Sequence, residues 1–129
     1  TLSGNPIGIT CGLKTIEILE KLNPYEEIEK NLSYLTSNLR KIFEEKGIKI
    51  SINNAVTFFS IFFLEKEPKN LEEVQKQDIK IFKKIFKRIL EKGILLPPSP
   101  FEALFLSIFH KKDIIDETIS KFEEIVKKF

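Results

Sequence analysis

An acidic side chain follows a proline-rich stretch in the last third of the sequence. Three prolines, at positions 97, 98 and 100, precede Glu102, and the residues on both sides of this acid are apolar. Proline fixes its own φ angle and biases the preceding residue towards an extended backbone, so we expect a stiff loop between two short strands. A carboxylate among apolar neighbours is costly to bury without a partner. Glu102 is therefore either a surface residue, which is the more common case, or an acid presented to a ligand.

Two other side chains with reactive chemistry, His110 and Cys11, have simpler interpretations. His110 lies at an expected strand-to-helix junction and is interpreted as a turn or capping residue rather than a catalytic base. Cys11 lies in a stripe of small residues that includes Gly8 and Gly12, which indicates close packing against another backbone rather than a reactive thiol. One cysteine and one histidine give no basis for a metal site, and no metal ligand is assigned.

The composition is that of one cytoplasmic domain. The chain has 129 residues, 42% of them hydrophobic, which is enough for a single core. The single cysteine excludes an intramolecular disulfide and suits a reducing cytoplasm. Twenty-one basic and nineteen acidic residues give a net charge of +2, and without a basic stripe neither nucleic acid nor a membrane is an expected partner. Because the sequence contains no methionine, we expect it to be part of a longer gene product.

Helical spacing of apolar residues predicts four helices. The first starts at Asn5-Pro6, where a polar cap precedes a proline that fits the first turn. The second starts with the same signal at Asn23-Pro24 and ends at Gly47. The third ends at Gly93, and the fourth begins near Asp113.

The strands are predicted from alternation and from apolar runs. Residues 48–52 alternate between isoleucine and polar residues, and Asn53-Asn54 is expected to turn the chain. Residues 55–64 form a longer apolar strand that should lie centrally in a sheet, with both faces largely covered. A further strand is expected at residues 104–109. The fold class is therefore α+β, a small antiparallel sheet of about three to four strands with helices packed on one face.

Three stretches of the sequence resemble one protein family. They are Thr-Leu-Ser-Gly-Asn-Pro at residues 1–6, the proline-rich stretch at residues 93–103, and Leu-Ser-Ile-Phe-His at residues 106–110 with Asp-Ile-Ile-Asp after it. In matching order along the whole chain, they are similar to the C-terminal part of glutamate-1-semialdehyde 2,1-aminomutase, a fold type I enzyme of the class III aminotransferases that depends on pyridoxal phosphate. The resemblance implies the C-terminal domain of such an enzyme.

The resemblance also implies a reaction and a domain organisation. The family converts glutamate 1-semialdehyde to 5-aminolevulinate for porphyrin biosynthesis, through an intermediate with two amines and no net oxidation. Residues 1–46 would be helices leading from the large cofactor-binding domain, and residues 47–129 would be the small domain. The Schiff-base lysine would lie upstream of Thr1, so the chain alone should be inactive and should not bind pyridoxal phosphate.

Two site residues follow from the family's motifs. Thr1 matches a threonine that binds the cofactor phosphate of the neighbouring subunit, and Glu102 matches an acid that faces the substrate pocket. Aminotransferases of this group that accept dicarboxylic substrates tend to place an arginine in this region. An anion suits an intermediate with two amines better, because opposite charge stabilises ammonium groups.

The implied partners are a small-molecule substrate, a second subunit in a homodimer, and glutamyl-tRNA reductase. Two alternatives to the aminomutase stay open at this point. One is the small domain of another class III aminotransferase, for example one that acts on an ω-amino acid. The other is an interaction module without chemistry.

Overall fold

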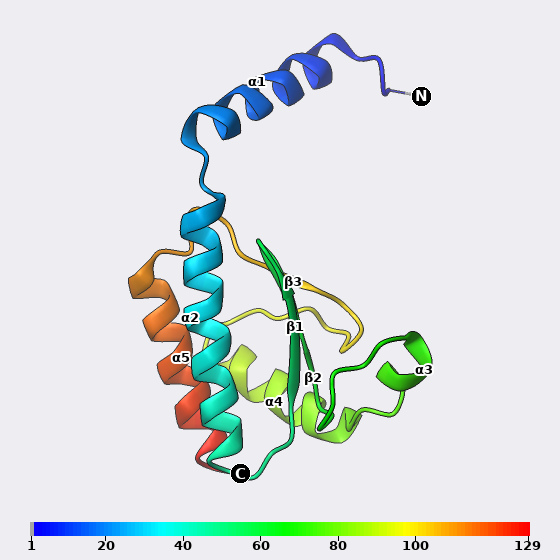
Figure 1. Cartoon of the computed structure of the whole chain (residues 1–129), viewed down its shortest axis with the longest axis vertical. Coiled ribbons are helices and arrows are strands. Elements are labelled where there is room, and N and C mark those ends of the chain that lie inside the picture. The colour runs from blue at the N-terminus through cyan, green and yellow to red at the C-terminus, as the bar shows by residue number, and fades with distance from the viewer. Residues whose placement is uncertain (1) are drawn as a thin grey trace.

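The computed structural model describes residues 2–129 and shows helices packed around a small sheet, which confirms the predicted α+β class (Figure 1). Among these residues the sheet has three antiparallel strands. The elements in chain order are α1 (Pro6–Leu22), α2 (Tyr25–Glu44), β1 (Ser51–Ala55), β2 (Phe58–Phe62), α3 (Leu71–Val74), α4 (Ile79–Glu91), β3 (Leu104–Phe105) and α5 (Lys112–Val126).

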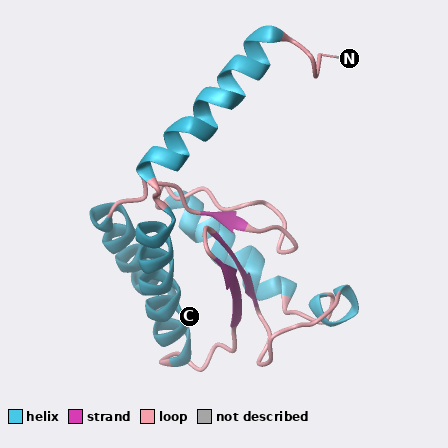
Figure 2. Cartoon of the chain, turned by 45° about the horizontal axis from the view of Figure 1, so that its top comes forward, coloured by secondary structure: helices cyan, strands magenta, loops and turns pink. Residues whose placement is uncertain are grey.

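The strand order is β1-β2-β3, so β2 is the central strand, as its apolar sequence predicted. In Figure 2 helices lie beside these short strands, and α2 packs against both α5 and β1. Side chains of α2, α4 and α5 share one core with Ile52, Phe59 and Phe63. The predicted packing of the helices on one face of the sheet is therefore confirmed.

The other face of β2 is only partly covered. Phe62 is buried, but Phe58 is exposed and stacks on the exposed Phe105, with 5.7 Å between the ring centroids. These two residues also face each other in the β2–β3 register. The expectation that both faces of the central strand are largely covered is therefore met on one face and only in part on the other.

Helix α1 extends away from the rest of the molecule (Figures 1 and 2). It starts as predicted, because the Asn5 side chain accepts the Ile7 amide at 2.9 Å and Pro6 occupies the first turn. None of its residues is buried. Cys11 is exposed, and a Cβ atom added at Gly12 would have no heavy atom of residues 2–129 within 4 Å. Residues 2–129 therefore provide no close packing partner for Cys11, and its interpretation as a packing residue stays a prediction.

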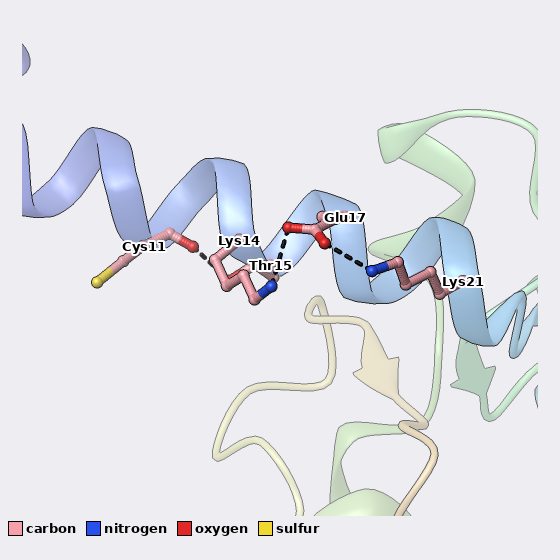
Figure 3. A network of polar contacts seen from close by, with 5 residues as sticks. All are labelled: Cys11, Lys14, Thr15, Glu17 and Lys21. Carbon is pink, nitrogen blue, oxygen red and sulfur yellow. Dashed lines mark hydrogen bonds and ion pairs between the residues drawn. The ribbon is translucent and has the colours of Figure 1, made fainter.

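A short polar strip runs along α1 (Figure 3). Glu17 accepts from Lys14 at 2.9 Å and from Lys21 at 2.7 Å, and the Thr15 hydroxyl donates to the Cys11 carbonyl at 2.8 Å. Ion pairs at this spacing support a helix only weakly when they are exposed, because water screens the charges. They give local support to a helix of which no residue is buried within residues 2–129.

The second helix starts differently from the prediction. Asn23 ends α1 in the left-handed region, with φ of 40°, and its amide donates to the Leu19 carbonyl at 2.8 Å. Pro24 is the cap of α2 and provides no side-chain hydrogen bond. The polar residue in the Asn-Pro signal therefore closes the preceding helix, a role that left-handed asparagine commonly takes. The predicted end is confirmed, since Gly47 has φ of 66°.

The first hairpin is shifted from the prediction. Asn53 and Asn54 do not turn the chain but pair with Ser60 and Phe59 inside the sheet. Strand β1 begins at Ser51 rather than at residue 48, and β2 is shorter than residues 55–64. The turn lies at residues 56–57, where Val56 has φ of 41°. The register that brings the apolar faces together outweighs the local turn preference of asparagine and the strain at a β-branched residue.

The third strand is also shorter than expected, and residues 94–96 form no strand. Strand β3 ends at Phe105, after which the Leu106 amide donates to the Thr57 carbonyl at 2.8 Å. The next amide, of Ser107, donates to the His110 ring at 2.9 Å. Because Phe105 already pairs with Phe58, the first residue of β2, a longer third strand would have no residue of β2 opposite it.

The contact between α4 and α5 predicts a specific acid sensitivity. Hydrogen bonds from Lys92 and Lys128 lower the pKa of Glu124 from 4.5 to about 2. The bonds at 2.7 and 2.9 Å favour the ionised form in the folded state, so their stabilisation is complete above pH 4.5. It is lost as the pH falls from 4.5 to about 2.

We expect the difference in thermal midpoint between the wild type and Glu124→Gln to shrink as the pH falls from 4.5 and to vanish near pH 2. Thermal melts of both proteins at several pH values measure it. Glu91→Gln is the control, because this acid has no ion pair within residues 2–129. A midpoint difference that stays constant with pH would contradict the assignment.

Candidate functional site

The proline-rich residues 97–102, called the proline loop below, connect α4 to β3. Helix α4 ends at Glu91, and Gly93, whose φ is 81°, then turns the chain as predicted. The Ile94 amide then donates to the Ile89 carbonyl at 3.1 Å and closes the helix. Within the loop, the Glu102 amide donates to the Ser99 carbonyl at 3.4 Å, and the Phe101 amide donates to the Ser99 hydroxyl at 3.3 Å. The predicted loop is therefore present and closes on Ser99, although no strand precedes it within residues 94–96.

Glu102 is exposed, and within residues 2–129 no lysine, arginine or histidine forms an ion pair with it. An exposed carboxylate keeps its hydration, so this position costs the fold little. The side chain is available to a ligand or to another part of a larger protein. Its role towards a substrate stays a prediction.

A pocket of about 600 Å³ opens between the helices, the sheet and the segment that contains the proline loop. Its volume lies within the usual range for small-molecule sites. Its walls come from α2, β2, β3, α5 and residues 93–98, and most of the side chains are apolar. Glu102 lines the pocket together with, among others, Leu39, Phe59, Leu96, His110 and Phe122. Glu102 is therefore next to a largely apolar hollow.

The lining does not fit a phosphate-bearing cofactor. Within residues 2–129 neither lysine nor arginine lines the pocket, and its carboxylate would repel a phosphate. Thr1, the residue predicted to bind the cofactor phosphate, lies outside the described residues. No set of three or more histidine, cysteine, aspartate or glutamate side chains within residues 2–129 could hold a metal ion.

His110 acts as a turn residue, as expected. Its Nδ1 accepts the Ser107 amide at 2.9 Å and lies 3.1 Å from the Ser107 hydroxyl. Its carbonyl accepts from the Asn31 side chain of α2 at 3.3 Å. Because Nδ1 accepts an amide proton, the neutral ring carries its own proton on Nε2. These bonds fix the junction between β3 and α5 and account for the residue without a catalytic role.

Sequence reasoning did not find Gln77, which contacts the proline loop. The side-chain amide of this residue donates to the Pro100 carbonyl at 3.3 Å, across 23 positions of sequence. A glutamine between charged residues gives no signal of burial. Only the tertiary structure shows that this residue and the loop meet.

None of the helices within residues 2–129 is both long enough and apolar enough to cross a membrane. No family model matches the chain. The chain is 35% identical over 128 residues to the glutamate-1-semialdehyde 2,1-aminomutase of Aquifex aeolicus and 40% identical over 130 residues to that of Thermosipho africanus. It is 38% identical over 125 residues to that of Methanocaldococcus jannaschii.

These alignments cover 97–99% of the chain and 29–30% of each relative. The chain thus spans about three tenths of the length of the curated relatives that it matches. The expected resemblance is confirmed, and neither the small domain of another class III aminotransferase nor an interaction module is favoured.

A solved structure described as a transaminase with pyridoxal phosphate bound has a similar fold. The TM-score is 0.74 over 96% of this chain and 27% of that one, at 17% sequence identity. At this identity the match concerns the fold alone. The arrangement of helices and strands in this chain therefore occurs as one part of a larger transaminase.

Proposed function

We propose that the chain is the C-terminal part of a glutamate-1-semialdehyde 2,1-aminomutase, which converts glutamate 1-semialdehyde to 5-aminolevulinate in porphyrin biosynthesis. The observation that carries this proposal is the identity of 35–40% to such enzymes over nearly the whole chain. The similar fold within a transaminase is consistent with it. Membership of a larger protein also has support from the structure of α1.

Helix α1 is apolar over most of its circumference. Ile7 and Ile16 lie about two and a half turns apart and so face opposite sides of the helix. Both are exposed, as are Ile9, Leu13, Ile18 and Leu22. The strip of Lys14, Glu17 and Lys21 provides a polar side (Figure 3). A flat surface would cover only one side of such a helix, so its sequence suits burial in a groove of a larger body.

The rest of that body would supply the cofactor chemistry. We infer that the full-length enzyme binds pyridoxal phosphate and that its Schiff-base lysine lies outside this chain. When bound, the cofactor would exchange amino groups with the substrate. The chain alone would be inactive, because that lysine would not be part of it.

Glu102 would hold the substrate by charge. The proline loop keeps this acid at the edge of the apolar pocket, where an anion attracts the ammonium groups of a molecule that carries two amines. An arginine at this place would instead attract a second carboxylate. The charge at residue 102 would thus favour the aminomutase reaction over ordinary transamination.

The organisation of the full-length protein is part of the same proposal. Residues 1–46 would lead from the cofactor-binding domain and residues 47–129 would form the small domain, although α2 shares its core with the latter. Thr1 would bind the cofactor phosphate of the neighbouring subunit in a homodimer. We infer that the full-length enzyme is cytoplasmic and that it receives its substrate from glutamyl-tRNA reductase.

An assay of the full-length protein tests the proposal directly. Purified enzyme supplied with pyridoxal phosphate and glutamate 1-semialdehyde should form 5-aminolevulinate without an added amino donor or acceptor. A reaction that proceeds only with an external amino acid and keto acid would identify an ordinary aminotransferase and contradict the proposal.

The burial of α1 gives a second test. Ile16→Asp should lower the stability of the full-length protein by about 2 kcal/mol, because it would bury an unpaired charge. The same change should leave the chain alone nearly unaffected, since Ile16 is 55% exposed there. Denaturant unfolding of both proteins measures the difference, with Lys14→Gln as the control on the polar strip. Equal effects of Ile16→Asp in both proteins would mean that α1 is not buried in the larger one.

A further inference from the structure

Gln77 is a buried polar residue beside the proline loop. It lies between α3 and α4 and is only 5% exposed. Its Nε2 donates to the Pro100 carbonyl at 3.3 Å, and its Oε1 is buried with no hydrogen-bond partner within residues 2–129. A buried amide that is satisfied on one side only calls for an explanation.

The bond from Gln77 is the only hydrogen bond within residues 2–129 that reaches the proline loop from elsewhere in the chain. The other two bonds of the loop are internal and end on Ser99. The prolines and Ser99 therefore set the shape of the loop. Gln77 sets where the loop lies relative to the body of the domain.

Backbone hydrogen bonds hold Gln77 and its neighbour Asp78 in place. Its own amide donates to the Val74 carbonyl at 3.2 Å, and the next residue, Asp78, donates its amide to the Phe63 carbonyl at 3.2 Å. The Asp78 side chain also accepts the Lys80 and Ile81 amides at the start of α4. The glutamine is thus held between the end of β2 and the first turn of α4.

The stability of the fold does not explain this glutamine. A leucine of similar size would fill the site without leaving an amide oxygen unpaired, and an unsatisfied buried acceptor opposes folding. What a leucine could not do is hold the Pro100 carbonyl. The position of the loop is therefore the property that the glutamine provides.

We propose that Gln77 is a positioning residue for Glu102, which fixes the proline loop so that the carboxylate stays at the edge of the pocket. This proposal rests on the function of Glu102 proposed above. Pro100 and Glu102 are two positions apart in a stiff turn, so a shift at the first carries over to the second. Gln77 needs no contact with the substrate for this role.

The test uses four full-length enzymes: wild type, Gln77→Leu, Glu102→Gln and the double variant. Gln77→Leu should lower kcat by about tenfold with little change in KM, because a displaced group loses its geometry in the transition state. The double variant should be no slower than Glu102→Gln, because the loop then has no carboxylate to position. Gln75→Leu is the control, since Gln75 is an exposed glutamine nearby.

The outcomes separate the two proposals. Multiplied losses in the double variant, or an unchanged kcat in Gln77→Leu, would overturn the positioning role. If Glu102→Gln alone keeps the wild-type rate, the proposed function of Glu102 fails. Amide hydrogen exchange then tests whether Gln77 holds the loop. Faster exchange of the Phe101 and Glu102 amides in Gln77→Leu would then support its hold on the loop, and unchanged exchange would refute it.

Discussion

Glu102→Gln in the full-length protein is expected to slow the formation of 5-aminolevulinate by about 10- to 100-fold. A hydrogen bond to a charged group contributes about 1.5–3 kcal/mol, and each 1.4 kcal/mol corresponds to a factor of ten in rate. Glutamine has nearly the same shape but no charge, so it removes the attraction for the substrate's ammonium groups. Because Glu102 is exposed and unpaired within residues 2–129, the unfolding midpoint should change little.

Steady-state kinetics and thermal melts of the same protein samples measure both effects. Glu72→Gln is the matched control, because Glu72 is exposed and lies on α3, away from the pocket lining. It should change neither rate nor midpoint. Wild-type turnover in Glu102→Gln would show that the carboxylate has no part in the reaction.

The largest change of stability is expected for Phe43→Ala, which should cost about 3–5 kcal/mol. Phe43 is fully buried at the end of α2. Its ring meets Phe63 and Phe122 edge-to-face, with centroids 6.0 and 6.3 Å away. Removing it would leave a cavity where α2, α5 and the segment after β2 come together.

Urea unfolding of the wild type and the variant measures this change as a shift in the midpoint at a constant slope. Phe109→Ala is the control, because Phe109 is 75% exposed and its loss should cost less than about 0.5 kcal/mol. Similar midpoints for the two variants would mean that the aromatic contacts around Phe43 do not form the centre of the core.

The four longer helices could be predicted from sequence because most of their start and stop signals are local, whereas the short helix α3 was not predicted. Asn5 caps α1, and Gly47 and Gly93 adopt the left-handed backbone that ends a helix. The strands could be predicted only in part. Asn53-Asn54 carries a strong turn signal, yet pairing with β2 places it inside the sheet. Register depends on residues that are distant in sequence, and no local pattern reports it.

In the candidate site, too, local features could be predicted from the sequence and contacts between distant segments could not. A loop at the three prolines and a turn at His110 follow from residue types, and both are present in the structure. The bond from Gln77 to Pro100 joins segments whose approach depends on the whole fold.

The packing of α2 against α5 also bears on the order of folding. These two helices make the most extensive helix–helix contact of the domain, although the whole sheet and α4 lie between them in sequence. Contacts between distant segments slow folding, because the loop between them must close first. During synthesis α2 therefore leaves the ribosome long before α5. Its apolar side stays exposed until α5 has been synthesised, and chaperones can bind it in this interval.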